Sequence, residues 1–175
     1  MADNEVLIPF IEERLVKVRS NPKGKKRVPR YRINLVREGG LWVHEKNLNR
    51  PHQVYEFAAQ VVEEDELDRE ALYVICLDQK NRVIGVNLVA LGHLTATLTH
   101  AREVFKTAVL LNAASVIVFH NHPSGVADES KQDVQVTRAL YKAGEILGIN
   151  MLDHVIVGDN VYTSIMERHP DIRGK

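Results

Sequence analysis

An uninterrupted β-rich run at positions 115–119, SVIVF, limits the fold of this chain more than any other segment. Apolar residues occupy both alternating faces of the run, which is typical of a strand covered on its two sides. Apolar residues at helical spacing precede it over 101–114 and follow it over 130–147. A covered strand between two amphipathic helices predicts an α/β fold in which helices pack on both faces of a sheet.

The rest of the pattern supplies further strands and one more helix. Apolar residues recur at helical spacing just after Pro51, and Gly148 ends the helix predicted over 130–147. Short β-rich runs separated by turn residues predict the remaining strands, the third and fourth of them forming a hairpin. These predicted strands lie at 31–36, 41–44, 72–77, 83–91, 151–157 and 161–165. The whole pattern predicts a mixed sheet flanked by helices.

Length and composition indicate one soluble domain. The chain has 175 residues, of which 45% are hydrophobic and 26% charged, so it can bury a core and is not wholly disordered. The steady periodicity begins near Pro51, which predicts a basic N-terminal extension over 1–50 and a folded domain over 51–175. The single cysteine, Cys76, excludes an intramolecular disulfide and a Cys-only zinc site. Because the chain has neither an apolar run of about 18 residues nor an export signal, we expect a cytoplasmic protein with no membrane partner.

The charges are balanced overall but unevenly distributed. Lys+Arg and Asp+Glu each number 23, yet the segment Arg14–Arg37 holds ten basic residues and no acid. Such a segment can bind the phosphates of DNA, or it can be a solvated arm. Its turn-rich sequence NPKGKK favours the solvated arm, and DNA contact stays as the alternative.

The segment HNHPSGVADESKQD at 120–133 carries the side chains suited to chemistry. His120 and His122 follow the covered strand two positions apart, and residues i and i+2 of an extended chain point to the same side. Asp133 stands eleven positions after His122, in the first turn of the predicted helix. Two imidazoles and a carboxylate leave a fourth position for water, as in catalytic zinc sites. The segment therefore predicts a metal site.

Each part of this segment also has a structural explanation. Ser130 and Asp133 are spaced as a capping box, in which each side chain accepts a backbone N–H of the other residue. Pro123 and Gly125 are ordinary turn residues, and a histidine at the end of a strand is commonly a loop residue. The combination of strand, His-x-His, turn and capped helix at this spacing favours metal binding over these separate explanations.

The same residues resemble a known signature. His120-x-His122, seven residues, Ser130, two residues and Asp133 is similar to the JAMM signature of MPN-domain (JAB) metallopeptidases. The stretches AREVFKTAVLLNAASVIVFHNHPSG and LDHVIVGDNVYTS resemble the bacterial RadC-like branch of that family. The resemblance extends over positions 51–165.

The sequence departs from the RadC-like pattern in three places. Ala101 stands where that branch usually has proline, and residues 127–129 lack a proline often found before the serine. Full-length RadC proteins carry a helix-hairpin-helix segment, which residues 1–50 do not resemble. We therefore expect the short form of the family, without that segment.

The resemblance implies a fold and a metal. The fold is the three-layer sandwich of MPN/JAB domains, which is cytidine-deaminase-like, and the metal is one Zn²⁺ per chain held by His120, His122 and Asp133. Ser130 would point its hydroxyl at the oxyanion of the tetrahedral intermediate. The alternative for Ser130 is a helix cap alone.

The resemblance also implies a glutamate just before an upstream strand, which would take a proton from water and pass it to the leaving amine. Glu70 matches that position, whereas the residues alone do not separate it from Glu66 or Glu103. His154, in a predicted strand, is either a core histidine or a partner that orients a metal ligand.

Three functions follow from these features. The leading hypothesis is a zinc-dependent hydrolase of amide bonds, peptide or isopeptide, with a protein or peptide as substrate. The second is a protein associated with DNA repair, in which the segment Arg14–Arg37 contacts nucleic acid. The third is a non-catalytic interaction module, which the retained ligand set disfavours.

Overall fold

A computed structural model gives the structure of residues 35–37, 39–40, 47–65, 68–92 and 100–174. The predicted strand at 41–44 and most of the strand at 31–36 lie outside these residues, as does most of the basic segment; Leu35 and Val36 are described and belong to no strand. The chain divides between Val36 and Arg37 into two units, and the fold below is that of the second.

This unit alternates helices and strands around one sheet. The helices are α1 (Pro51–Glu64), α2 (Ala101–Leu110), α3 (Lys131–Leu147) and α4 (Ile165–Arg168), followed by the 3-10 helix η1 (Pro170–Arg173). The strands are β1 (Ala71–Leu77), β2 (Val83–Leu91), β3 (Ser115–Asn121), β4 (Asn150–Val157) and β5 (Tyr162–Ser164). None of the described helices combines the length and the hydropathy needed to cross a membrane.

The sheet is mixed, with the strand order β2-β1-β3-β4-β5. β3 and β4 run parallel, and all other neighbours are antiparallel. The parallel pair is joined through α3, the crossover connection that such a pair requires. The predicted mixed sheet and the predicted hairpin of β1 and β2 are both confirmed.

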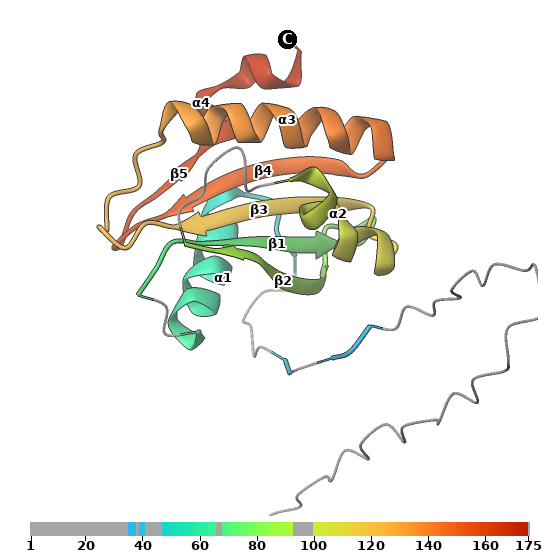
Figure 1. Cartoon of the computed structure of the whole chain (residues 1–175), viewed down its shortest axis with the longest axis horizontal. Coiled ribbons are helices and arrows are strands. Elements are labelled where there is room, and N and C mark those ends of the chain that lie inside the picture. The colour runs from blue at the N-terminus through green and yellow to red at the C-terminus, as the bar shows by residue number, and fades with distance from the viewer. Residues whose placement is uncertain (1–34, 38, 41–46, 66–67, 93–99, 175) are drawn as a thin grey trace, which may run out of the picture. The chain divides into compact units, whose positions relative to one another are not determined.

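Helices cover both faces of the sheet, so the domain has three layers (Figure 1). Successive side chains of β1 and β3 point to opposite faces. Tyr73 and Phe119 stack at 4.7 Å between ring centroids on the face covered by α1. Val74 and Val118 are buried on the other face, against α2 and α3. Every residue of β1 and β3 is buried, as the unbroken apolar run predicts.

The C-terminal part differs from the sequence prediction. A strand was expected over 161–165, whereas β5 ends at Ser164 and α4 begins at Ile165. The Ser164 hydroxyl accepts the backbone N–H of Glu167 at 3.1 Å and so caps the new helix. Ile165 is buried as expected, but in a helical turn.

Candidate metal centre

The sheet topology brings the predicted site residues to one end of the domain. β1 and β3 are antiparallel with Leu72 opposite His120, so the residue before β1 lies at the edge where β3 ends. That residue is Glu70. β3 leads into the loop that begins α3, whose first turn holds Asp133. In Figure 1 this end lies at the left, where β3 ends and β1 begins.

The two histidines meet through their Nε2 atoms, which are 3.0 Å apart. His120 is fully buried in β3, and His122 lies just beyond the strand and is partly exposed. The Nδ1 of His122 lies 2.7 Å from the backbone oxygen of Val126. A carbonyl oxygen only accepts, so Nδ1 of His122 carries a proton, and in the neutral ring Nε2 then bears a lone pair.

Two carboxylates approach the same point. Oδ1 of Asp133 lies 3.8 Å, and Oε1 of Glu70 4.0 Å, from Nε2 of His120. Ligand atoms of Glu70, His120 and His122 all lie within 4.8 Å of one another. Asp133 therefore approaches His120, while Glu70 approaches both histidines. Either carboxylate can supply the third ligand to a cation placed between the rings.

The capping box is present and occupies only one oxygen of Asp133. Its Oδ2 accepts the backbone N–H of Ser130 at 2.8 Å and the Ser130 hydroxyl at 2.7 Å. The Ser130 hydroxyl in turn accepts the backbone N–H of Asp133 at 3.1 Å. Because Oδ1 faces His120, the cap and a metal site can coexist, and the two explanations given by the sequence are compatible.

A third histidine, His154, contacts the ring nitrogen of His120 that faces away from His122. Nε2 of His154, in β4, lies 2.9 Å from Nδ1 of His120. The other nitrogen of His154 lies 2.7 Å from the hydroxyl of Thr137, which donates to the backbone oxygen of Asp133 at 2.6 Å. Thr137 and His154 are both buried, between α3 and the sheet. Of the two readings of His154, the structure favours the partner that orients a ligand.

Burial keeps the two inner histidines neutral. It lowers the pKa of His120 well below its ordinary value. Electrostatic interaction with His154 and His122 lowers this pKa further, and interaction with the Asp133 carboxylate opposes the shift. Burial, with a smaller effect of His122, lowers the pKa of His154 to about 3. Neutral imidazole is the form that binds metals, so this environment prepares His120 as a ligand at neutral pH.

The donor set fits a divalent cation. Two imidazole nitrogens face each other, and two carboxylate oxygens lie within 4.0 Å of one of them. Acceptors that converge in this way lower their free energy by sharing a cation. Two nitrogens with one or two oxygens suit Zn²⁺, and also Fe²⁺ or Mn²⁺.

The structure also separates the three candidate glutamates. Glu70 lies beside the histidines, whereas Glu103 stands on α2, where its carboxylate pairs with Lys106 at 2.7 Å. Glu66 lies outside the described residues. Sequence reasoning did not single out Thr137. Its position one helical turn after Asp133 was the available signal, because residues i and i+4 share a helix face.

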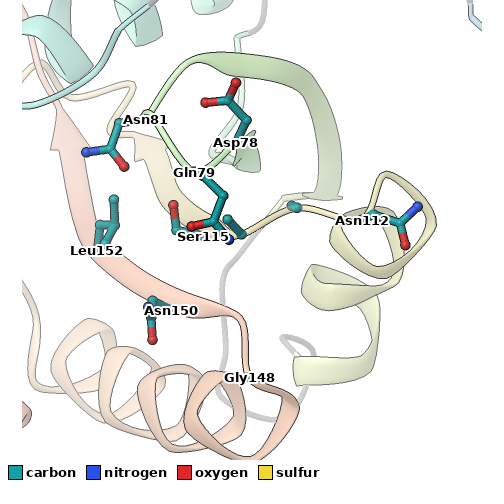
Figure 2. A pocket seen from close by; sticks show the side chains of 10 residues that line it. Asp78, Gln79, Asn81, Asn112, Ser115, Gly148, Asn150 and Leu152 are labelled. Carbon is teal, nitrogen blue, oxygen red and sulfur yellow. The ribbon is translucent and has the colours of Figure 1, made fainter.

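A polar hollow lies at the opposite end of the sheet, away from these residues. Its volume is about 370 Å³, and it is lined by the ends of β1 and α2 and by the starts of β3 and β4 (Figure 2). Its polar side chains are those of Asp78, Gln79, Asn81, Asn112, Ser115 and Asn150. It contains no histidine and one carboxylate, so its donor set does not match that of the metal centre.

The sequence also matches a known family. A profile of the family described as "RadC-like JAB domain" matches residues 48–170. The chain belongs to the RadC-like JAB domain family. The resemblance seen in the sequence and the expected α/β sandwich with a mixed sheet are thus confirmed.

This JAB domain is also similar to curated proteins of several organisms. A "UPF0758 protein" of Desulfitobacterium hafniense (strain DSM 10664 / DCB-2) is 49% identical over 102 residues, which cover 58% of this chain and 45% of the relative. One of Symbiobacterium thermophilum is 48% identical over 122 residues, 70% of this chain and 51% of the relative. One of Methanococcoides burtonii is 48% identical over 102 residues, which cover 58% of this chain and 44% of the relative. The chain spans about half the length of the curated relatives it matches, and their names state no activity.

Proposed function

We propose that this JAB domain is a zinc-dependent hydrolase of amide bonds in a protein or peptide, peptide or isopeptide in type. The proposal rests on the mutual proximity of Glu70, His120 and His122, together with the approach of Asp133 to Nε2 of His120. One Zn²⁺ per chain would be held by the two histidines and Asp133. Bound there, the ion would supply Lewis acidity and an activated water at neutral pH.

Differences in exposure support a catalytic centre over a closed structural one. His120 and Asp133 are buried, whereas Glu70 and His122 are partly exposed. The centre is therefore anchored from inside the fold and accessible from one side, as a site that admits substrate must be. A structural zinc site would instead be closed by four protein ligands.

Glu70 and Ser130 take the remaining roles in the proposal. The partly exposed Glu70 carboxylate, 4.0 Å from Nε2 of His120, is near enough to accept a proton from attacking water and return it to the leaving amine. The Ser130 hydroxyl, at the start of α3, would turn from Asp133 to donate to the oxyanion of the substrate.

Two conservative variants separate the base from the ligand. Glu70→Gln is expected to bind zinc as the wild type does and to cleave quenched peptide and isopeptide reporters about 10²–10⁴-fold more slowly, since it cannot accept a proton. Asp133→Asn is expected to lose zinc. Zinc loss in Glu70→Gln with retention in Asp133→Asn would exchange the two roles. Cleavage unaffected by Glu70→Gln, or no cleavage by the zinc-loaded wild type, would contradict the proposal.

The second hypothesis, DNA contact through the basic segment, finds no support among the described residues. They include only three positions of Arg14–Arg37, at 35–37.

A further inference from the structure

A chain of hydrogen bonds reaches His120 on its Nδ1 side, away from the metal centre, and the donor in each bond can be assigned. It begins at the backbone oxygen of Asp133 and passes through Thr137 and His154 to His120. Its three distances are 2.6, 2.7 and 2.9 Å, all within the normal range for hydrogen bonds. All four residues are at least nine-tenths buried, so the protein itself determines where each proton sits.

The carbonyl at the start of the chain fixes the first proton. A backbone oxygen only accepts, so the Thr137 hydroxyl donates its single proton to the oxygen of Asp133. The hydroxyl oxygen must then accept from Nδ1 of His154. A neutral imidazole has one N–H, and His154 has used it, so its Nε2 bears a lone pair.

That lone pair fixes the proton of His120. Nε2 of His154 accepts from Nδ1 of His120, which therefore carries the only N–H of this ring. The remaining nitrogen, Nε2, bears a lone pair and faces His122, Asp133 and Glu70. We infer that Thr137 and His154 are positioning residues which hold His120 in the one tautomer able to bind metal through Nε2.

The inference rests on the proposed metal centre but reaches further, because it assigns a role to a threonine that touches no metal ligand atom. The hydrogen-bond chain also connects two of the proposed metal ligands, Asp133 and His120. This hydrogen-bond chain starts on the backbone of Asp133 and ends on the ring of His120. It therefore links α3 to β3 by hydrogen bonds through His154 of β4. Without the Thr137 hydroxyl, His154 has no acceptor for Nδ1–H and is expected to move its proton to Nε2. It would then donate to His120 and place the His120 proton on Nε2, where metal should bind.

Nitrogen-15 imidazole spectra of the metal-free protein test the inference directly, because the ¹⁵N shift separates a protonated from an unprotonated ring nitrogen. Signals are assigned with a His154→Gln variant. In the wild type and in Thr137→Ser, His154 is expected to carry its proton on Nδ1. In Thr137→Val it is expected to carry it on Nε2. A wild-type His154 protonated on Nε2, or one unchanged by Thr137→Val, would overturn the inference.

Zinc affinity, measured by competition with a chelator, supplies the second readout. Thr137→Val is expected to bind zinc about 10–100-fold more weakly than wild type, and Thr137→Ser to restore binding. Thr163→Val makes the same change at a buried threonine of β5 and is expected to leave affinity unchanged. Equal affinities in all variants would overturn the inference while the metal centre stands. Because the spectra need no metal, they decide the inference even if the wild type binds no zinc.

Discussion

The two ends of the central sheet both collect polar side chains, and they differ in how those side chains are bonded. At the end where β3 finishes, His120, Asp133 and His154 are buried. Hydrogen bonds fix Nδ1 of His120 and Oδ2 of Asp133, and they leave Nε2 of His120 and Oδ1 of Asp133 3.8 Å apart. Acceptor atoms lie close together at this end, and a shared cation would lower their free energy.

At the opposite end the side chains of Asp78 and Asn81 have protein partners. The carboxylate of Asp78 accepts from the backbone N–H groups of Lys80 and Arg82 at 2.8 and 3.0 Å and from Nε of Arg82 at 2.7 Å. Nδ2 of Asn81 donates to Oδ1 of Asn49 at 3.0 Å. These hydrogen bonds stabilise the turn between β1 and β2.

The difference shows that a polar hollow is a weaker sign of a site than a small buried cluster. The hollow has volume, whereas the candidate metal centre brings ligand atoms of three residues within 4.8 Å of one another. Because buried polar atoms must find partners, an excess of buried acceptors indicates a ligand more strongly than the shape of the surface does.

Acid should destabilise the two ends in different pH ranges, and this is the largest effect that we expect. The pKa of His154 falls from an ordinary 6.5 to about 3 in the fold, so its contribution to stability is complete above pH 6.5 and lost as pH falls toward 3. At about 1.4 kcal/mol per unit the loss is on the order of 5 kcal/mol. The pKa of Asp78 falls from 3.8 to about 2, so its contribution is lost only between those values.

Urea unfolding of the metal-free protein at several pH values checks this contrast. Between pH 7 and 5 the wild type is expected to lose unfolding free energy, while His154→Gln has a flatter dependence and Asp78→Asn follows the wild type. Equal slopes for wild type and His154→Gln would show that His154 is not held neutral by the fold.

Ser130→Ala separates catalysis from capping at the first end. Loss of an oxyanion donor is expected to lower kcat about 10²–10³-fold, and loss of the cap to lower the unfolding free energy by about 1 kcal/mol. Ser164→Ala removes the cap of α4 and is expected to destabilise the fold without changing kcat. An unchanged kcat in Ser130→Ala would leave this serine as a cap only.

Asn112 offers the smallest effect, at the second end. It has a φ of 52°, a left-handed conformation that disfavours most side chains. Asn112→Ala is expected to lower the unfolding free energy by about 1 kcal/mol, and Asn112→Gly to preserve it, with zinc affinity equal to wild type in both. Weaker zinc binding in either variant would contradict the independence of the two ends.

Local sequence patterns predict most of this fold because the elements are locally specified. The run at 115–119, the hairpin and the capped helix α3 each follow from periodicity and turn residues, and Gly148 ends α3 in a left-handed conformation as expected. The short helix α4 was missed because Ile165 suits either a strand or one buried helical turn. A single apolar residue does not distinguish these periods.

The sequence likewise predicts one part of the candidate site and not the other. His120, His122 and Asp133 lie on adjoining elements, so their spacing alone predicts that they can meet. Glu70 comes from another strand, and only the pairing of β1 with β3 brings it to the same edge. The chain through Thr137 and His154 depends on the depth at which α3 lies over β4, which no local pattern contains.

Zinc stoichiometry tests the central claim most directly. The wild type, His122→Ala and His52→Ala are purified without a metal-binding tag, titrated with Zn²⁺ and analysed for metal after dialysis. His52, an exposed histidine of α1, is the matched control. The account predicts about one zinc per chain in the wild type and in His52→Ala, and none in His122→Ala. A wild type that is folded and retains no zinc, or a His122→Ala variant that retains as much as the wild type, would contradict it.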